Sequence, residues 1–416
     1  MDRAKAGPAP VVDQAAGDAA RRAAALPKVV LHEHLDGALR IDSLLALLRE
    51  RGVEPPARDA RTMAAWLDAN AHAGSLERFL EGFALTVAAM ASVDALARVA
   101  REVAEDALAE GAVLAEFRIA PLLFEAFGLS ADAVVEALLD GLARCPALPS
   151  GLIVCAMRHL PPGETLRAAR LALRFAGRGP SGRGGPGGPG VVGFDLAGAE
   201  FGHPCSEHAE ALALVRRAGL PMTLHAGEAD AAERVLEAAR HGARRIGHGV
   251  RLADALADPE RRPLVDEVRA RGLHLEVCPT SNVHTGAAAS IAAHPITALW
   301  RAGVSLSVHT DNPLFSRTST TAEMAALMRE TPLTEADLLA MTRQAAAASF
   351  LGTSAREQAL RRIDAAAEAM ASKAARVGSD RGGDARNARD ARDTKGAQDA
   401  QAPEGARTAE RAASVR

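Results

Sequence analysis

The sequence predicts a (β/α)₈ barrel with additional helices and terminal extensions. Short apolar segments alternate with longer amphipathic ones along most of the chain, which is the pattern of strands each followed by a helix. A doubly wound sheet would show the same alternation. Polar residues, however, stand at the C-terminal ends of predicted strands spread across the whole chain, and only a closed barrel brings all those ends to one mouth.

Eight segments have the length and apolar content of strands. They are Lys28–His34, Val113–Ile119, Leu152–Met157, Val191–Leu196, Pro221–His225, Arg245–Gly247, Leu273–Cys278 and Val304–His309. Amphipathic segments with helical periodicity separate them. Examples are Ile41–Arg51, Leu76–Met90, Val93–Glu110, Ala131–Ala143, Ser206–Ala218, Ala231–His241 and Leu264–Arg271.

Three segments have the composition of chain outside a packed fold. We expect residues 1–26 to form a disordered N-terminal extension and residues 27–373 to form the barrel domain. Residues 177–190 (GRGPSGRGGPGGPG) contain too much Gly and Pro for a helix or strand, so they indicate a flexible surface insertion. Residues 374–416 mix Arg, Asp, Gly, Ala and Gln without apolar periodicity, so we expect a disordered tail.

Composition narrows the classes of partner. The 416 residues carry a formal net charge of −3, which gives no electrostatic reason to expect nucleic acid or an anionic membrane. The four cysteines form no CxxC pair and are typical of reduced thiols, and no apolar stretch of about 20 residues is present. These features favour a cytoplasmic protein. Tyrosine is absent, so a tyrosine general acid is excluded, and nothing in the sequence decides the oligomeric state.

The first chemical motif is His32-Glu33-His34, at the end of an apolar run. Residues i and i+2 of a strand face the same side, so His32 and His34 can share one metal ion while Glu33 points away. Two surface histidines at a strand end would give the same pattern. Taken alone, the motif leaves both interpretations open.

Three further motifs end later predicted strands. His225 ends one strand and Glu228 follows on the loop, His248 stands between two glycines, and Asp311 follows the last strand. Together with the first two histidines, they can supply the mixed nitrogen and oxygen ligands that zinc or a similar divalent ion takes. One histidine is then left over to act as a base or to support a ligand.

These motifs resemble those of the adenosine deaminase family of metal-dependent amidohydrolases, most closely its bacterial members. The resemblance rests on LHEHLDG, HAGE, RIGHG and HTDNP. It extends through SLERFLEGF, AEFRIAP, DLAGAE and CPTSN, which occur in the family's order. The H-x-E and P-C-x-x-C motifs of the other zinc deaminase architecture are absent.

The resemblance implies one Zn²⁺ ion per chain and a role for each matched residue. It assigns the metal to His32, His34, His225 and Asp311. Glu228 would protonate the purine at N1, His248 would orient the attacking water, and Asp311 also counts among the catalytic residues. In the substrate site, Asp36 would bind the ribose 5′-hydroxyl and the Gly198 N–H would face N3, with His34 and Asn312 beside them.

Two residues depart from the family pattern. Asn312 stands where mammalian members have a second aspartate that contacts N7; an amide can donate to N7 directly, so the change fits purine binding. His309 stands where the family often has asparagine. It is either an extra group that tunes the site or a strand histidine packed in the core.

The expected function is therefore hydrolytic deamination of adenosine, and of 2′-deoxyadenosine, to inosine and ammonia in purine salvage. Zinc supplies a hydroxide-like nucleophile near neutral pH, and a protonated ring nitrogen makes the adjacent carbon electrophilic. A deaminase of adenine or of another aminopurine nucleoside, a zinc-dependent amide hydrolase and a non-catalytic nucleoside-binding protein are the alternatives. In each case the partner is a small molecule, and for the favoured function it is a purine nucleoside.

Overall fold

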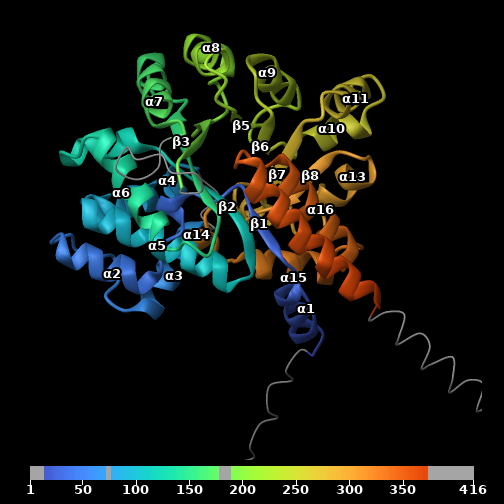
Figure 1. The fold of residues 1–416 in the computed structure, drawn as a ribbon, viewed down its shortest axis with the longest axis horizontal. Helices are drawn as coiled ribbons and strands as arrows, with labels where there is room; N and C mark the ends of the chain where they lie inside the picture. The colour runs from blue at the N-terminus through green and yellow to red at the C-terminus, as the bar shows by residue number, and fades with distance from the viewer. Residues whose placement is uncertain (1–13, 72–75, 178–188, 373–416) are drawn as a thin grey trace, which may run out of the picture. The chain divides into compact units, whose positions relative to one another are not determined.

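The computed structural model describes residues 14–71, 76–177 and 189–372, and eight parallel strands form their centre (Figure 1). All eight predicted strands are confirmed, with small changes at their ends. The strands are β1 (Lys28–Val30), β2 (Ala112–Ile119), β3 (Ser150–Met157), β4 (Val191–Ala197), β5 (Thr223–Ala226), β6 (Arg245–His248), β7 (His274–Val277) and β8 (Ser305–Val308).

Backbone hydrogen bonds close these strands into a barrel. Strands β1 to β4 pair in sequence order, and so do β5 to β8. Phe194 N donates to Pro221 O at 3.1 Å and joins the two sets on one side. On the other side, His34 N donates to Asp311 O at 2.9 Å and Asp311 N donates to His32 O at 3.0 Å. The second seam is therefore made by residues that sequence analysis placed in the metal site.

Helices surround the strands and connect each strand with the next (Figure 1). They are α1 (Gln14–Ala25), α2 (Ile41–Glu50), α3 (Ala60–Ala71), α4 (Leu76–Met90), α5 (Val93–Ala109), α6 (Ala131–Ala143), α7 (Pro162–Phe175), α8 (Ala209–Arg217), α9 (Glu233–His241), α10 (Leu252–Ala257), α11 (Arg262–Ala270), α12 (Pro279–His284), α13 (Ile296–Arg301), α14 (Pro313–Ser316), α15 (Thr320–Glu330) and α16 (Glu335–Ala348). Three short 3₁₀ segments, η1 (Leu35–Gly37), η2 (Pro121–Phe127) and η4 (Cys205–His208), follow β1, β2 and β4.

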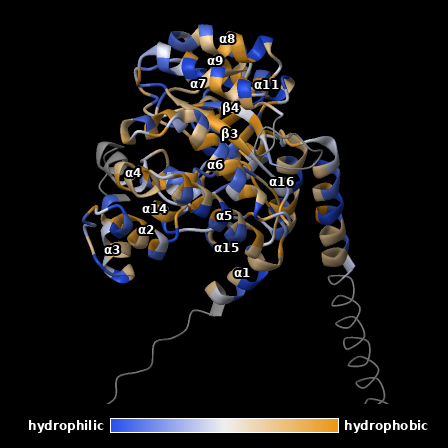
Figure 2. Ribbon diagram, turned by 60° about the vertical axis from the view of Figure 1, so that its left-hand side comes forward, coloured by the Kyte–Doolittle hydropathy of each residue, from blue (hydrophilic) through white to orange (hydrophobic). Residues whose placement is uncertain are grey.

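Local capping explains where several helices begin. Ser92 and Ser130 each accept a hydrogen bond from the backbone N–H three residues later, at the starts of α5 and α6. Thr334 and Asp337 form a reciprocal capping box at the start of α16. Figure 2 shows hydrophobic strands at the centre and hydrophilic residues on the outward helix faces.

The interior of the barrel also holds charged side chains. Arg118, Arg245, Glu116 and Glu276 are all fully or almost fully buried. Arg245 pairs with Glu116 at 2.7 Å and with Glu276 at 2.6 Å, so each buried charge has an opposite neighbour. The interior of the barrel is consequently a packed core, and the site at the barrel mouth rests on it.

The expected disorder of the whole N-terminal extension is wrong for residues 14–25, which form α1. Ala19 and Ala23 of this helix are buried, and Lys28 donates to Ala23 O and Ala24 O at its C-terminal end. The remaining expected flexible segments, 1–13, 178–188 within the Gly/Pro-rich insertion, and 374–416, lie outside the described residues. The described residues up to Asp364 belong to one compact unit, and the described residues 365–372 belong to a separate one.

Within the described ranges, no single helix is long and apolar enough to cross a membrane. One bent pair, Gly82–Met90 with Val93–Ala109, meets the length and composition criteria across a 113° bend. Helix α5 of this pair has a buried face and packs in the barrel's helical layer.

Candidate active site

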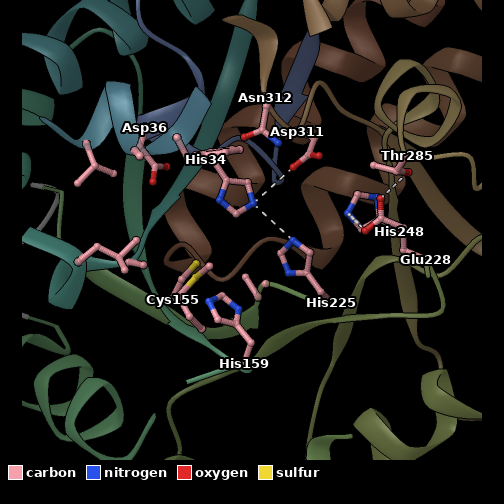
Figure 3. A pocket seen from close by; sticks show the side chains of 18 of the residues that line it. His34, Asp36, Cys155, His159, His225, Glu228, His248, Thr285, Asp311 and Asn312 are labelled. Carbon is pink, nitrogen blue, oxygen red and sulfur yellow. Dashed lines mark hydrogen bonds and ion pairs between the residues drawn. The ribbon is translucent and has the colours of Figure 1, made fainter. Parts of the chain in front are cut away.

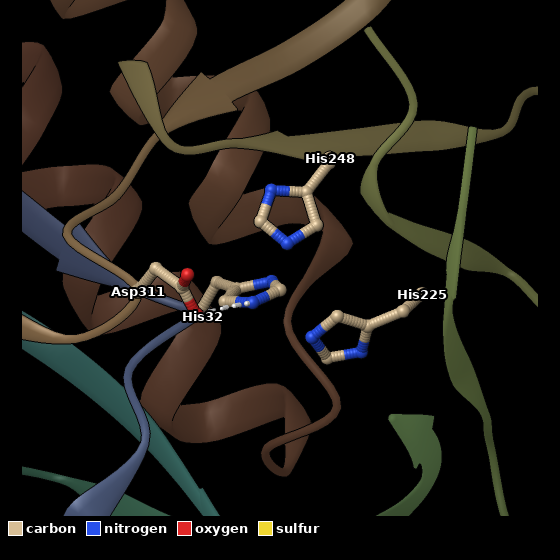
Figure 4. Close-up of side chains that lie close together, drawn as sticks. All are labelled: His32, His225, His248 and Asp311. Atoms are coloured by element: carbon tan, nitrogen blue, oxygen red, sulfur yellow. Dashed lines mark ion pairs between the residues drawn. The ribbon is translucent and has the colours of Figure 1, made fainter. Parts of the chain in front are cut away.

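The C-terminal ends of β1, β5, β6 and β8 bring the predicted metal-site residues together. Figure 4 shows His32, His225, His248 and Asp311 facing one another, and their potential ligand atoms all lie within 4.8 Å. His34 joins them, because its Nε2 lies 3.4 Å from His225 Nε2 and 3.4 Å from Asp311 Oδ1. Five side chains from four motifs that are distant in the sequence thus converge as the motifs predicted.

Two buried carboxylates orient two of these histidines. Glu276 Oε2 lies 2.9 Å from His32 Nδ1, and Asp195 Oδ2 lies 3.0 Å from His225 Nδ1. A carboxylate on one ring nitrogen leaves the other nitrogen directed at a metal, which is a common arrangement around protein metal sites. Both Nε2 atoms therefore face the centre of the cluster.

A single guanidinium joins these two carboxylates. Arg118 from β2 donates to Asp195 Oδ2 at 2.8 Å and to Glu276 Oε2 at 2.6 Å, and all three side chains are fully buried. Burial alone would raise the pKa of Glu276, but Arg118 and Arg245 outweigh it and hold that pKa well below its ordinary value. Burial would likewise raise the pKa of Asp195, but His225 and Arg118 outweigh it and hold that pKa below its ordinary value. Both carboxylates remain charged and able to hold the histidines.

The unpaired atoms at the centre fit a metal ion. His32 Nε2 is buried and has no hydrogen-bond partner among the described residues, although Asp311 Oδ1 lies 3.3 Å away. Burial and the nearby Arg118 charge lower the pKa of His32 to about 4, so the ring is neutral and Nε2 can offer a lone pair. Neutral imidazoles and a carboxylate are the ligands that zinc takes in catalytic sites.

A directed hydrogen-bond chain sets the proton on His248. Ile296 N donates to His294 Nδ1 at 3.1 Å, so the proton of His294 is on Nε2, which lies 3.2 Å from Asn282 Oδ1. The Asn282 amide nitrogen then faces His248 Nδ1 at 3.1 Å. Because Nδ1 accepts this bond, the neutral His248 ring carries its proton on Nε2, which lies 3.4 Å from Glu228 Oε2.

Both His248 and Asp311 have left-handed backbones, with φ of 63° and 61°. Non-glycine residues rarely adopt this conformation, and it is concentrated at functional sites. The surrounding contacts hold it in place: Ser281 Oγ donates to Asp311 Oδ2 at 2.7 Å, and Asn282 holds His248. The turn directs each side chain across the barrel mouth.

A cavity of about 370 Å³ opens over this cluster (Figure 3). One part of its wall is polar and includes His34, His225, His248, Asp311, Asp36 and Glu228. The remainder is apolar and comes from α4, η2, β3 and β4. The apolar lining residues are Phe83, Ala84, Val87, Ala120, Leu123, Phe127, Cys155, Met157 and Ala197. Such a wall suits a flat heterocycle, and the polar residues can orient it.

The predicted substrate-binding residues all line this cavity. Asp36 is 4 % exposed, and its Oδ1 has no hydrogen-bond partner within the described chain. Asn312 lies beside Gly37, where a Cβ atom would overlap its amide oxygen. Gly198 has a φ of +91°, and a Cβ there would lie 2.7 Å from His159 Nδ1. Only glycine leaves the backbone at residue 198 open to a ligand.

Glu228 lies on the loop after β5 and reaches the same cavity (Figure 3). Its Oε1 accepts a hydrogen bond from Thr285 Oγ1 at 3.0 Å, and its Oε2 faces His248. The Glu228 carboxylate is therefore held from two sides next to the metal cluster, where it can exchange a proton with a bound molecule.

His309, the second departure, is a packed strand histidine. Its Nδ1 accepts from Leu31 N at 3.3 Å, its Nε2 lies 2.6 Å from Ser307 Oγ, and burial lowers its pKa well below the ordinary value. His309 is 1 % exposed and is not among the residues that line the cavity. Its ring supplies an acceptor to β1 at the seam with β8.

Sequence reasoning assigned no role to Arg118, Asp195, Glu276, Asn282 or Thr285. A signal existed for some of them. Glu276 stands between Leu275 and Val277 in a buried strand, and Asp195 stands between two apolar residues of β4. A charged residue in a buried strand needs a partner. The partners themselves come from other strands, so the sequence could not identify them.

The fold and this site define a (β/α)₈ barrel with a cluster of histidines and an aspartate at its mouth that could hold a metal ion, an arrangement typical of metal-dependent hydrolases. The family model described as "Adenosine deaminase" matches residues 27–366. An adenosine deaminase of Mycobacterium ulcerans is 40% identical over 350 residues, which are 80% of this chain and 92% of that protein. The chain therefore belongs to the adenosine deaminase family.

Solved structures share the fold. A crystal structure of Arabidopsis ADAL complexed with IMP has a TM-score of 0.69 at 26% identity, covering 83% of this chain and 98% of that one. An amidohydrolase from Burkholderia ambifaria with bound Zn has a TM-score of 0.73 at 22% identity, covering 88% of this chain and 98% of that one. The second likeness supports the barrel fold alone.

Proposed function

We propose that this chain catalyses the zinc-dependent hydrolytic deamination of adenosine, and of 2′-deoxyadenosine, to inosine and ammonia. The observation that carries this proposal is the Glu228 carboxylate, held by Thr285 and His248 beside the metal cluster and facing an apolar cavity. The mycobacterial relative, whose name is adenosine deaminase, supports the choice of substrate. Purine salvage in the cytoplasm is the setting we propose for the reaction.

We assign the metal to His32, His34, His225 and Asp311. The geometry alone would also admit His248 in place of His34. A metal ligand needs an unprotonated nitrogen, and the hydrogen-bond chain through Asn282 puts the His248 proton on Nε2, the atom that faces the cavity. His34 Nε2, in contrast, lies against two assigned ligands.

Zinc, when bound, supplies the Lewis acidity that activates water near neutral pH. The residues of the chain perform the proton transfers. Glu228 donates a proton to N1 of the purine, which makes C6 electron-poor, and His248 Nε2–H donates to the oxygen that adds to C6. Water supplies both protons. One reaches N1 through Glu228, and the other moves from the hydroxyl group on C6 to the amino group, so that the C6–N bond breaks, ammonia leaves and the C6=O bond of inosine forms.

Three polar groups recognise the nucleoside in this proposal. The unpaired Asp36 Oδ1 accepts a hydrogen bond from the ribose 5′-hydroxyl, and the Gly198 N–H donates to N3. Asn312 donates its amide to N7 without the protonation that an aspartate would need. Asp36 favours a nucleoside over free adenine, because a base alone would leave the buried Asp36 Oδ1 without a partner.

The test is the ultraviolet change and the ammonia released when the purified protein meets adenosine, with 2′-deoxyadenosine, adenine and AMP in parallel. Turnover of adenosine that is lost on chelation and restored by zinc supports both the reaction and the metal. Turnover of a different aminopurine keeps the mechanism and moves the substrate. A zinc-loaded protein inactive on all four compounds would reject the proposal.

A further inference from the structure

One buried carboxylate outside the cavity, that of Glu200, holds the loop that carries Glu228. Glu200 follows β4 and is 4 % exposed. Its Oε1 accepts a hydrogen bond from Gly227 N at 2.5 Å, and its Oε2 accepts one from Glu228 N at 3.0 Å. The backbone N–H groups of Ala229 and Asp230 donate to the same Oε2 at 2.8 Å and 3.1 Å.

Four consecutive N–H groups directed at one carboxylate form an anion-binding loop whose anion is a side chain of the same protein. An ionised carboxylate only accepts hydrogen bonds and has about four lone-pair sites, so it can satisfy all four donors. A glutamine at residue 200 would turn its NH₂ group toward N–H donors. At least one buried N–H would then lose its partner, and the loop would move to find another.

We propose that Glu200 is a positioning residue for proton transfer, because it fixes the Glu228 backbone and through it the place of the Glu228 carboxylate. This inference rests on the proposed role of Glu228 as proton donor to N1. A second contact agrees with it: Arg251 Nε donates to Glu228 O at 3.1 Å, so both backbone polar groups of Glu228 are held. Displacement of a reacting group by about 1 Å can slow a reaction roughly 100-fold.

The segment Asp195–Glu200 also contacts several parts of the site. Asp195 orients His225, Gly198 opens the cavity wall, and Glu200 holds the loop that follows β5. The six residues Asp195 to Glu200 therefore relate the metal cluster, the purine site and the proton donor to one another. The function of the last residue of the DLAGAE motif is accordingly to set the distance between Glu228 and the bound purine.

The test compares two ligands that differ in their need for a proton at N1. Purine riboside has hydrogen at C6. When water adds across its N1–C6 double bond, the hydroxyl group bonds to C6, the proton bonds to N1, and no group leaves. 1-Deazaadenosine has a C–H in place of N1 and cannot take that proton. Glu200→Gln should weaken purine riboside binding about 100-fold and leave the Kd of 1-deazaadenosine within about threefold.

The same variant should lose kcat on adenosine by about 100-fold with KM changed by less than about threefold. The ultraviolet change that marks hydration of purine riboside should be lost with the tight binding. Glu200→Asp retains the charge on a shorter side chain, so it should restore part of both quantities. Glu207→Gln removes an equal charge from a carboxylate that is 48% exposed, and it should behave as the unaltered protein.

Two outcomes would overturn this inference and leave the proposed function intact. The first is a Glu200→Gln variant that matches the unaltered protein. The second is an equal loss of affinity for both ligands in Glu200→Gln and in Glu200→Asp, which indicates a merely structural role. If Glu200→Gln does not fold, Glu200→Asp decides between these readings by the same two ligands. An unaltered zinc-loaded chain that neither deaminates adenosine nor hydrates purine riboside overturns the proposed function itself, so the two failures are distinguishable.

Discussion

The side-chain amide of Asn282 lies 3.1 Å from His248 Nδ1 and holds that nitrogen as a hydrogen-bond acceptor. The direction of this bond is fixed by a backbone N–H two residues beyond His294, which can only donate. Burial lowers the pKa of His294 to about 3, so this ring stays neutral. Because its Nδ1 accepts, its Nε2 must donate to Asn282. A non-titrating backbone group thus determines which nitrogen of the His248 ring bears the proton.

Asn282→Asp should reverse the His248 tautomer. A carboxylate accepts rather than donates, so the ring proton would move to Nδ1 and Nε2 would lose its donor function. We expect kcat to fall by about 100-fold, the usual scale for a lost proton-transfer group, while bound zinc is retained. Histidine ¹⁵N chemical shifts and zinc content, measured with kcat, check both parts.

The exposed substitution Ala289→Asp adds the same charge to the loop that follows α12, the helix that contains Asn282, and serves as the control. Unchanged turnover in Asn282→Asp, with an Nδ1–H tautomer visible by NMR, would separate the tautomer from catalysis. It would also reopen the choice between His34 and His248 as the third histidine ligand.

Arg118→Met should weaken both stability and metal binding. Removing the guanidinium leaves Asp195 and Glu276 buried without their shared cation, and breaking a buried ion pair costs about 3–5 kcal/mol. Because these carboxylates orient His225 and His32, zinc affinity should fall roughly 10–100-fold. Urea unfolding measures the first effect, and competition with a chelator measures the second.

Arg40→Met is the matched control. Arg40 is 42% exposed and pairs with Asp106, so its loss should cost no more than about 1 kcal/mol and leave zinc affinity unchanged. Lower stability of Arg118→Met without any change in zinc affinity would show that the carboxylates hold their histidines independently of the guanidinium.

Periodicity predicted all eight strands because each is an apolar run followed by an amphipathic helix. The ends were less accurate: β7 is His274–Val277 rather than Leu273–Cys278, since the flanking apolar residues are also buried but leave the strand pairing. Helix α1 escaped prediction because its apolar residues are all alanines, which bury little surface each, and a helix of 12 residues depends on packing for its order.

The sequence predicted the site residues that can be recognised from a single strand. His32, His225 and Asp311 can be recognised because each is a polar residue at the end of an apolar run. Arg118 does not, because its meaning depends on Asp195 and Glu276, which come from two other strands and meet it only in the closed barrel. Contacts between strands distant in the sequence require the tertiary fold.

Gly198→Ala should impair substrate binding more than it impairs folding. A Cβ at residue 198 would lie 2.7 Å from His159 Nδ1, so either the ring or the backbone N–H must move away from the purine. We expect KM for adenosine to rise roughly tenfold, the value of one neutral hydrogen bond. Steady-state kinetics with adenosine and 3-deazaadenosine, which lacks the N3 acceptor, measure the effect.

Gly202→Ala has the same left-handed strain, with φ of +82°, but an added Cβ meets no atom within 4 Å. It should lower stability slightly and leave KM unchanged. An equal rise of KM in both variants would assign the effect to backbone strain. A normal preference for adenosine over 3-deazaadenosine in Gly198→Ala would remove the N3 contact from the proposal.

Glu323 should make the folded state less stable as pH rises from 4.5 toward 7. Burial raises the pKa of this carboxyl to about 7, although Thr280 and Thr318 donate to it, and Asp311 adds to the rise. Between the unfolded and folded pKa values the folded state binds more protons, so the free energy of unfolding falls with pH. The loss amounts to roughly 3 kcal/mol by pH 8.

Glu323→Gln cannot titrate, so the difference in unfolding free energy between it and the unaltered chain should shift in favour of the variant by that amount from pH 4.5 to 8. Urea unfolding at four pH values measures the difference. A difference that stays constant over this range would mean that Glu323 titrates normally in the folded protein.

Asp36 should make the enzyme select nucleosides over nucleotides. Its carboxylate lines the cavity and is 4 % exposed, and burial raises its pKa to about 7, so it is charged at pH 8. A phosphate oxygen about 4 Å away would be repelled by about 4 kcal/mol at a dielectric constant of 20, which corresponds to roughly 1,000-fold. We therefore expect kcat/KM for AMP to be at least about 1,000-fold below that for adenosine at pH 8.

Asp36→Asn should lower adenosine turnover about tenfold and raise the ratio of AMP turnover to adenosine turnover. Asp42→Asn, on the exposed first turn of α2, should change neither quantity. If AMP is turned over as well as adenosine by the unaltered chain, Asp36 does not face the 5′ end of the substrate, and the orientation of the nucleoside in the cavity must be reversed.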